Sequence, residues 1–421
     1  MSSSPLAKPK LLFLAYLLPW PLEGGGQIKS YQTLRLLAER FDITLLALIR
    51  TRAEAEHAAP LAPLCAGGLT TFLLPRGRGR DLVAMLRAAA TGQPLRIARD
   101  AAPAMSAAVR AALETEPFAA VHADHLTMLS FVPPPGDPLL SGVKIVLDQH
   151  NVEHRIVQHL ARGDGGVSPL LRAVARWEGP RLRRFEQAAC RRADLVLAVS
   201  EKDAGVFAEL LRGTGAAATV RVTPIGVDSG YFAPRNSPSR VSPMILTVGT
   251  MYWPPNVAGV RWFCAEILPL IRRQAPDACF QIVGTKPTPA VRALARTGQG
   301  CIRVTGTVPD VRPFMADCGV FVVPLRAGSG MRVKILNALA MGLPVVSTTL
   351  GAEGIAVTDR ENILLADTPE AFAAAVIRVL ADRALAARLG AGGRALAVRS
   401  YDWKVAGQCL LRAYEELIPR V

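Results

Sequence analysis

Short apolar runs recur along this chain, and those in the first half alternate with longer segments that carry apolar residues at helical spacing. Strands of this kind, alternating with helices, are typical of a parallel sheet covered by helices. The predicted loop Gly24–Lys29 and the predicted helix Ser30–Arg40 follow the first run. The predicted strands of this half are Lys10–Tyr16, Ile43–Leu48, Thr70–Leu74, Ala119–His122, Val143–Asp148, Leu195–Val199 and Val220–Thr223.

The same pattern starts again in the second half. The predicted strands there are Ile245–Val248, Phe280–Val283, Ile302–Thr305, Val320–Pro324, Val345–Ser347 and Ile363–Leu365. Residues 233–243, APRNSPSRVSP, are rich in Pro and Ser, so we interpret them as a linker. We therefore predict an α/β fold with one Rossmann-like domain over residues 1–232, a second over 244–399, and a C-terminal helix over 400–421 whose apolar face can pack back on the first domain.

Composition narrows the class of protein. Half of the 421 residues are apolar and 20 % are charged, which is typical of folded domains. The net charge of +15 suits nucleic acid, an anionic membrane surface or a phosphorylated ligand, although a coding bias toward Arg and Ala gives the same balance. No basic segment is interleaved with aromatic residues and no recognition helix is evident, so we expect no nucleic-acid partner. The seven cysteines are scattered without a CxxC pair, which indicates reduced thiols and no metal site.

No segment of the sequence has the length and polarity expected of a membrane span. The apolar run Leu11–Leu18 is far shorter than the ~20 residues that a spanning helix needs. We expect a cytoplasmic protein, with peripheral contact at the inner membrane face as an option. The basic segment 170–195 fits either a solvated surface helix or contact with anionic lipid.

Two glycine-rich loops carry the candidate chemistry. The first, EGGGQIK, follows the first predicted strand, and Gly25 and Gly26 would let the backbone approach a ligand. It is neither a GxGxxG fingerprint nor a Walker A loop, which argues against a dinucleotide oxidoreductase and an ATPase. The second is more specific, because Gly328–Ser329–Gly330 precedes Arg332 and Lys334 at a predicted helix start. A diphosphate would be held there by two cations and by loop N–H groups.

Over nearly its full length the sequence resembles the retaining, metal-independent glycosyltransferases of group 1 (family 4). The similarity rests on EGGGQIKSYQTLRLLAERFDITLLAL, DLVLAVSEKD, VTPIGVDSGYFAP, GSGMRVKILNALAMGLPVVSTTLGAEGI and the closing YDW. DQHNVEHRI and GTMYWPPNVAGVRWF resemble a bacterial branch linked to exopolysaccharide and cell-surface glycans. The resemblance implies a GT-B fold, in which two Rossmann-like domains face each other across a cleft. It also implies a nucleotide-sugar donor on the second domain and an acceptor on the first.

The resemblance also implies where the donor binds. Two glutamates of the family fall on Ser329 and Asn337 here, so both carboxylates are absent, and Asn337 would bond the ribose. The family's Arg and Lys after the first strand of the second domain are missing too, and Arg332 and Lys334 are the expected substitutes at the phosphates. Donor-binding residues are expected to be Gly249, Gly284, Gly306, Gly328, Ser329, Gly330, Met331 and Asn337.

Polar residues after two strands of the first domain are the candidates for the acceptor side. The family often has His-x-His after a strand, and VHADH places Asp124 at the second position with His125 beside it. Either residue could serve the acceptor hydroxyl, or could cap the next helix. We predict Asp124, His125, Arg332 and Lys334 as catalytic. Predicted acceptor contacts are Gly25, Gly26, Lys29, His150, Asn151 and Glu153.

The sequence therefore predicts sugar transfer from a nucleoside diphosphate sugar to a hydroxyl of a glycan or a lipid-linked acceptor, with retention and without a metal or other cofactor. Two alternatives stay open. A non-catalytic nucleotide-sugar binding or assembly protein is favoured by the missing glutamates. A nucleotide-sugar epimerase would need a carboxylate or histidine array around the sugar, and the second domain shows none in its sequence.

Overall fold

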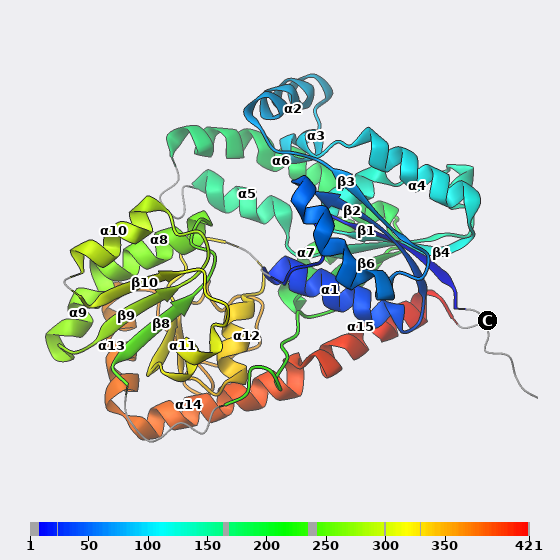
Figure 1. Cartoon of the computed structure of the whole chain (residues 1–421). Helices are drawn as coiled ribbons and strands as arrows, with labels where there is room; N and C mark the ends of the chain where they lie inside the picture. Colours follow the sequence, from blue (N-terminus) through cyan, green and yellow to red (C-terminus); the bar gives the residue numbers. More distant parts are fainter. Residues whose placement is uncertain are drawn as a thin grey trace, which may run out of the picture. The chain divides into compact units, whose positions relative to one another are not determined.

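A computed structural model describes residues 8–22, 24–162, 168–234, 242–298, 300–328 and 330–419 (Figure 1). The chain forms two compact units. The first contains the described residues up to Val157, Val174–Pro224 and those from Gly407 onward, and the second contains those of Gln158–Ala173 and Ile225–Ala406. The units thus divide after Pro224, eight residues before the predicted end of the first domain, and residues 235–241 of the predicted linker lie outside the described residues.

The first unit is built on a parallel sheet whose strand order is β3-β2-β1-β4-β5-β6-β7 in the described part of the chain. The central strands are buried on both faces, which explains why β1, β2 and β6 are nearly continuous apolar runs, whereas the edge strands β3 and β7 contain Thr and Arg. Its strands are β1 (Lys10–Ala15), β2 (Asp42–Ile49), β3 (Leu69–Leu73), β4 (Phe118–Asp124), β5 (Lys144–Gln149), β6 (Leu195–Ala198) and β7 (Thr219–Val222).

Helices cover both faces of this sheet. Alternate strand residues such as Leu12 and Val121 pack against α4, α6 and α7, whereas their neighbours Phe13 and Ala120 pack against α1 and α15. The α-helices that contribute to this unit are α1 (Gly25–Ala38), α2 (Arg78–Thr91), α3 (Leu95–Arg99), α4 (Pro103–Thr115), the start of α5 (Glu153–Arg162), α6 (Pro169–Arg192) from Val174, α7 (Glu201–Leu211), and α15 (Trp403–Leu417) from Gly407. The 3-10 helices are η1 (Arg52–Leu64), η2 (Leu126–Phe131) and η3 (Pro138–Leu140).

The predicted loop Gly24–Lys29 is wrong, because helix α1 already begins at Gly25. Glycine has a low helix propensity, but the helix buries Leu34 and Leu37 against the sheet. Packing of that apolar face outweighs the cost of two glycines in the first turn. The same start places Lys29 on the helix instead of in a loop, and Ser30 lies on the helix as predicted.

The second unit has a parallel sheet in the order β10-β9-β8-β11-β12-β13 within the described ranges. Its strands are β8 (Met244–Val248), β9 (Cys279–Val283), β10 (Ile302–Gly306), β11 (Val320–Val323), β12 (Val345–Ser347) and β13 (Leu364–Leu365). Two all-parallel, helix-covered sheets confirm the predicted α/β class with two Rossmann-like domains.

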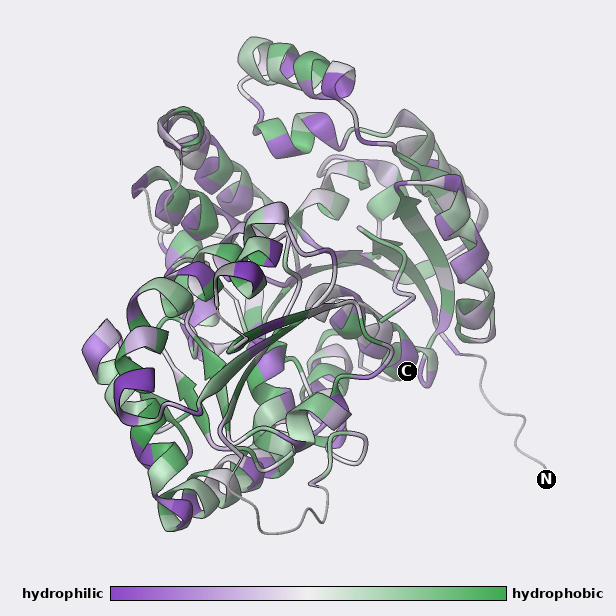
Figure 2. Cartoon of the chain, turned by 60° about the vertical axis from the view of Figure 1, so that its left-hand side comes forward, coloured by the Kyte–Doolittle hydropathy of each residue, from purple (hydrophilic) through white to green (hydrophobic). Residues whose placement is uncertain are grey.

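The helices of the second unit bury one apolar stripe each, with Phe263, Ile271 and Phe372 in the core beside the strands. Figure 2 shows the strands of the sheets mainly in green and the helices with both green and purple turns, as expected for amphipathic helices. The elements are α8 (Pro254–Trp262), the π-helix η4 (Phe263–Ile267), α9 (Leu268–Gln274), α10 (Pro289–Thr297), α11 (Arg312–Ala316), α12 (Val333–Ala340), α13 (Pro369–Ala381), α14 (Arg383–Leu396) and the π-helix η5 (Ala397–Tyr401).

Two further predictions concern membrane spans and the cysteines. Among the described residues, no helix combines the length and the apolar character needed to cross a bilayer. All seven cysteines lie in the described ranges and are free.

Candidate functional site

The polar residues predicted for the acceptor lie at the carboxyl end of the first sheet. β4 ends at Asp124, β5 ends at Gln149, and α5 begins at Glu153. Because β4 and β5 are parallel neighbours, with Asp124 opposite Asp148 in the register, their ends bring His125 and His150 to the same edge. The rings of these two histidines have centroids 5.2 Å apart.

Asp124 is buried and fully engaged. Its Oδ1 lies 2.8 Å from Nε2 of His150, and its Oδ2 accepts a hydrogen bond from the Ser30 hydroxyl at 2.7 Å. Burial alone would raise the pKa of Asp124, but the adjacent His150 and the Ser30 bond hold that pKa well below its ordinary value. Asp124 is therefore a carboxylate at neutral pH, suited to orienting a histidine or stabilising positive charge.

Lys29 lies inside the unit instead of at its surface. Its side chain is 3 % exposed and its ammonium group forms an ion pair with Asp148. On the other side of Asp148, Nε2 of His122 lies 3.7 Å from Oδ2. Nδ1 of His122 is 2.7 Å from the hydroxyl of Tyr414, which helix α15 contributes. Burial lowers the pKa of His122 to about 4, so its ring is neutral at neutral pH.

His125 has a strained backbone. Its φ of 97° and ψ of 148° lie in a region that is nearly restricted to glycine. Its N–H donates to the carbonyl of Asp148 at 2.9 Å, which fixes this conformation from the neighbouring strand. Burial, and then the charge of Arg96, lower its pKa well below the ordinary value, so the imidazole is neutral at neutral pH. Strain of this kind concentrates at functional sites.

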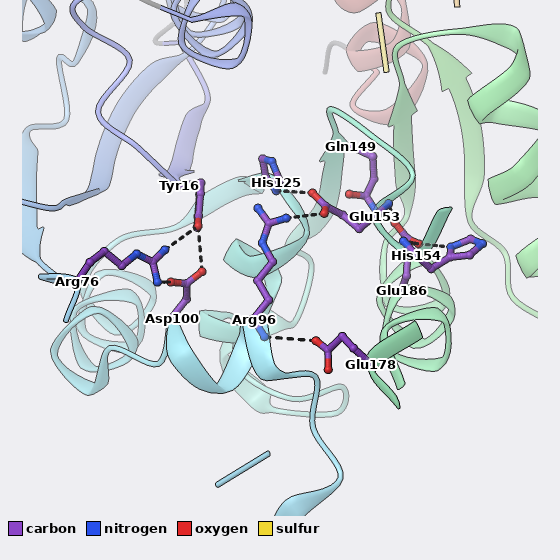
Figure 3. A network of polar contacts seen from close by, with 10 residues as sticks. All are labelled: Tyr16, Arg76, Arg96, Asp100, His125, Gln149, Glu153, His154, Glu178 and Glu186. Atoms are coloured by element: carbon purple, nitrogen blue, oxygen red, sulfur yellow. Dashed lines mark hydrogen bonds and ion pairs between the residues drawn. The ribbon is translucent and has the colours of Figure 1, made fainter. Parts of the chain in front are cut away.

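A buried network holds Glu153 next to His125 (Figure 3). Oε1 of Glu153 lies 3.6 Å from Nδ1 of His125, and its Oε2 forms an ion pair with Arg96. Glu186 accepts hydrogen bonds from the backbone N–H groups of Glu153 at 3.0 Å and of His154 at 3.3 Å. These N–H groups at the start of α5 have no acceptor within the helix, and Glu186 provides one. Burial raises the pKa of Glu153, and the charge of Arg96 opposes that rise.

Three residues at this edge meet the spacing of a metal site. One ligand atom each of His122, Asp124 and Asp148 lies within 4.8 Å of the others. The ammonium group of Lys29 already lies against Asp148, and both oxygens of Asp124 are bonded. The cluster therefore has an internal cation, and the prediction that no metal is needed stays a prediction.

The remaining predicted acceptor residues lie around His150. Gly25 is the first residue of α1, and a Cβ added at Gly26 would lie 3.7 Å from Nδ1 of His150. Asn151 is half-buried and directly follows His150. The structure thus gathers the predicted residues of the first domain at one sheet edge, with Lys29 directed to Asp148.

In the second unit, three predicted donor glycines follow or end neighbouring strands. The N–H of Gly249 donates to Val283 at 3.0 Å, and the N–H of Gly284 donates to Gly306 at 3.1 Å. A Cβ at Gly284 would lie 1.7 Å from the carbonyl oxygen of Gly249, so only glycine fits there. The two loops after β8 and β9 therefore approach each other at backbone distance.

The glycine-rich loop before α12 has the form that the sequence predicts. Gly328 has φ 124° and Gly330 has φ 82°, both in the left-handed region that favours glycine. Arg332 is the N-cap of α12, and its guanidinium folds back to the carbonyl of Gly330. Met331 is buried and Asn337 is half-buried on α12. Ser329, a predicted donor contact, lies outside the described residues.

Lys334 points from α12 to the loop after β8. Its Nζ donates to Oδ1 of Asn256 at 3.0 Å and lies 3.0 Å from the Cβ position that Gly249 leaves empty. Asn256 in turn donates to the carbonyl of Thr250 at 3.0 Å. Burial, and then the charge of Arg332, lower the pKa of Lys334 to about 7. Arg332 and Lys334 are therefore close enough to interact electrostatically, and a group of two such basic side chains beside a glycine-rich loop is suited to an anion.

A cavity of about 420 Å³ lies at the ends of β9 and β10. It is lined by Lys286, Arg292, Gly306 and Thr307 among others. Of the predicted donor-binding residues, Gly306 lines this cavity.

The sequence missed several residues of these sites. Tyr414 and Asn256 reach their partners over 292 and 78 positions of the chain, so no local pattern marks them. Arg96 lies in a short helix that has no motif of its own. Its only signal in the sequence is an arginine in a short polar segment, which is too common to be diagnostic.

Residues 242–382 match the family model described as glycosyl transferases group 1. A phosphatidyl-myo-inositol mannosyltransferase of Mycobacterium tuberculosis is 31 % identical over 158 residues, which covers 36 % of this chain and 42 % of that protein. An uncharacterized 44.6 kDa protein in the cps region of Klebsiella pneumoniae is 25 % identical over 139 residues, covering 32 % and 36 %. The matches thus span about two fifths of these relatives' length.

The fold comparison covers much more of the chain. The sucrose-phosphate synthase of Thermosynechococcus elongatus superposes with a TM-score of 0.70, covering 97 % of this chain and 99 % of that one. The identity is 18 %, so this likeness bears on the fold alone. Both predicted domains are included in it.

Proposed function

We propose that this chain transfers a sugar from a nucleoside diphosphate sugar to a hydroxyl group, because residues 242–382 match the group 1 glycosyltransferase model and the whole chain shares the GT-B fold. The observation that carries the proposal is the position of Arg332 and Lys334 at the start of α12, directly after a glycine-rich loop. Both cations lie in the region that matches the family model. A diphosphate is the part of the donor that such a site recognises.

The donor phosphates would bind between the start of α12 and the loop after β8. N–H groups at the start of α12 and the two side-chain cations favour negative charge there. Charge grows on the diphosphate as the glycosidic bond breaks, so preorganised donors lower the barrier to transfer. We place the ribose near Asn337, whose amide can both donate and accept hydrogen bonds.

The acceptor hydroxyl would bind at the edge formed by β4 and β5. A hydroxyl nucleophile needs a group that takes its proton in the transition state. Nδ1 of His125 has no hydrogen-bond partner among the described residues, whereas both oxygens of Asp124 are already bonded to His150 and Ser30. We therefore propose that His125 accepts the proton of the acceptor hydroxyl and that Asp124 orients His150. This refines the prediction that either residue serves the acceptor.

Three finer features belong to the proposal. Retention of anomeric configuration, independence from metal ions, and a role in cell-surface polysaccharide synthesis follow from the resemblance of the sequence. The mannosyltransferase relative acts, by its name, on a phosphatidyl-myo-inositol, which supports a lipid-linked acceptor as one option.

Peripheral contact with an anionic membrane from the cytoplasmic side is also part of the proposal. Helix α2 exposes Leu82, Val83 and Leu86 by 55 %, 64 % and 65 %, and Arg78 and Arg87 are exposed on the same helix. Apolar side chains beside arginines suit the boundary of an anionic bilayer. Co-sedimentation with phosphatidylglycerol vesicles should fall in Leu86→Glu, and equal sedimentation of this variant and the wild type would refute the contact.

The transfer proposal is tested by incubating the purified chain with UDP-, GDP-, ADP- and dTDP-sugars and following release of the nucleoside diphosphate. Slow hydrolysis of one donor class without acceptor, lost in Arg332→Ala, is expected. If one donor class binds but is neither hydrolysed nor transferred to any glycan or lipid acceptor, the non-catalytic binding protein becomes the better account. The absence of both family glutamates, at Ser329 and Asn337, is the observation that favours that second candidate.

A further inference from the structure

Four arginines gather on one side of the acceptor edge in the first unit. Arg50 directly follows β2, and Arg76 lies three residues after β3. Arg96 and Arg99 lie on α3. The ends of β1, β2 and β3 are neighbours in the sheet, and Tyr16, directly after β1, is the residue around which these side chains meet.

A single carboxylate contacts two of the arginines, and Figure 3 shows its contacts with Arg76 and Tyr16. Asp100 is fully buried, and its Oδ2 accepts a hydrogen bond from the Tyr16 hydroxyl at 3.0 Å. Its Oδ1 lies 2.6 Å from a terminal nitrogen of Arg76 and 3.7 Å from one of Arg50. The other terminal nitrogen of Arg76 donates to the Tyr16 hydroxyl at 3.0 Å.

Arg96 approaches the same tyrosine from the side of Glu153. Its guanidinium carbon lies 5.3 Å from the centre of the Tyr16 ring, and that of Arg50 lies 5.0 Å from it. The Tyr16 ring is in turn 5.0 Å from the ring of His125. The arginine cluster therefore adjoins the residue to which we assign proton transfer.

The guanidinium groups of the cluster are not all paired with carboxylates. Asp100 and Glu153 are the acidic partners of Arg50, Arg76 and Arg96, while Glu54 and Glu178 accept backbone N–H groups of Arg50 and Arg96. Buried nitrogens of Arg50 and Arg99 have no hydrogen-bond partner within the described residues. Burial lowers the pKa of Arg50, and the charges of Arg76 and Arg99 lower it further. Buried guanidinium nitrogens without a partner are costly unless an anion joins them.

We propose that Tyr16, Arg50, Arg76 and Arg96 form a subsite for a phosphate group of the acceptor. The inference rests on the proposed sugar transfer and specifies its acceptor as a phosphorylated molecule. Guanidinium groups bind phosphate oxygens in pairs of parallel hydrogen bonds, which fits several arginines around one point. A phosphate held beside Tyr16 would direct the rest of the acceptor toward His125, and so would fix which hydroxyl reacts.

Two sources of the phosphate share this chemistry, a water-soluble phosphate ester and a lipid headgroup. The first arm of the test titrates the full chain with glucose 6-phosphate at low salt by calorimetry. The second arm measures binding to vesicles that contain phosphatidic acid in phosphatidylcholine. Binding in either arm that depends on Arg76 supports the subsite, and the arm that responds identifies the source.

The variants are chosen to separate this cluster from general charge and from the donor site. Arg76→Gln and Arg50→Lys should weaken binding about tenfold or more, because charge-assisted bonds to the phosphate are lost. Arg110→Gln removes one charge from an exposed pair with Asp137 in the same unit and should bind as the wild type does. Lys334→Gln, in the second unit, should also leave phosphate binding unchanged.

Several outcomes would overturn the subsite. These are the absence of binding in both arms, equal loss in Arg110→Gln, or loss in Lys334→Gln without loss in Arg76→Gln. Failure of the subsite and failure of the proposed function can be told apart. If nucleotide sugars bind but phosphate binding ignores Arg76, the subsite falls while sugar transfer stands. If phosphate binding requires Arg76 but no nucleotide sugar binds, the anion site remains and sugar transfer falls.

Discussion

The hydroxyl of Tyr414 lies 2.7 Å from Nδ1 of His122 and joins residues 292 positions apart. Tyr414 comes from the C-terminal helix α15, and His122 lies in β4 two residues before Asp124. Both side chains are buried. The last helix of the chain is thereby tied to the strand that carries the candidate acceptor residues.

Tyr414→Phe should destabilise the protein by about 1–3 kcal/mol, because it leaves a buried ring nitrogen without its partner. Urea unfolding followed by circular dichroism measures this difference. Tyr252→Phe, at a tyrosine that is 55 % exposed, should change the free energy of unfolding by no more than about 0.5 kcal/mol. Equal stability of Tyr414→Phe and the wild type would show that the bond contributes nothing.

The lowered pKa of Lys334 predicts that donor binding depends on pH. A diphosphate binds the ammonium form, so binding takes up a proton wherever the unliganded side chain is neutral. With a pKa of about 7 in the free protein, affinity for a nucleotide sugar should fall by up to about tenfold per pH unit above that value. Calorimetry in two buffers of different ionisation enthalpy measures the proton uptake at pH 8. Lys334→Met should bind more weakly and lose this pH dependence.

The same pKa has a consequence for stability. In the unliganded protein the folded pKa of Lys334 is about 7, below the ordinary 10.5, so between these values the unfolded chain binds more protons. This residue therefore makes the free energy of unfolding rise as pH increases from about 7 to 10.5. In Lys334→Met that contribution should disappear, and an unchanged slope would mean that Lys334 is solvated.

The strain at His125 can be isolated with a pair of variants. His125→Gly and His125→Ala both remove the ring, but only alanine keeps the Cβ that disfavours φ 97°. In ordinary backbone glycine is the less stable of the two by about 0.5–1 kcal/mol, whereas here it should be the more stable by about 1–3 kcal/mol. Thermal unfolding compares them. If His125→Ala is the more stable of the two, the backbone at residue 125 is not strained.

The approach of Gly284 to Gly249 predicts a severe local effect. Gly284→Ala would place a Cβ 1.7 Å from a backbone oxygen, so one of the two loops has to move. We expect a loss of about 3 kcal/mol or more in stability, with weaker binding of nucleotide sugars. Gly205→Ala, at an exposed position of α7 with open space around it, should instead stabilise the protein by about 0.5–1 kcal/mol.

The fold could be predicted from the sequence because each strand is a local signal. Buried runs such as Val143–Asp148 need no partner to be recognised, and strands of a parallel sheet end at a common edge. Gly328 and Gly330 likewise reveal their loop, since their positive φ values favour glycine. These features depend on neighbours in sequence and on the rules of sheet topology.

The side-chain contacts could not be predicted, because they depend on tertiary packing. Lys29 is predicted at an acceptor site but lies against Asp148, since α1 starts earlier than its glycines suggest. Asn256 and Arg96 meet Lys334 and Glu153 only after distant elements have packed. The short helix α3 has too few residues for a periodic pattern to place it.

The central claim is that the loop before α12 binds the diphosphate of a nucleotide sugar. The most direct measurement is a thermal-shift screen of the wild type and Arg332→Ala against UDP-, GDP-, ADP- and dTDP-sugars. A ligand at about 100 times its Kd should add about 2.7 kcal/mol of stability. We predict stabilisation by one nucleotide class in the wild type and little or none in Arg332→Ala. Equal stabilisation of both proteins, or of neither by any donor, would contradict the claim.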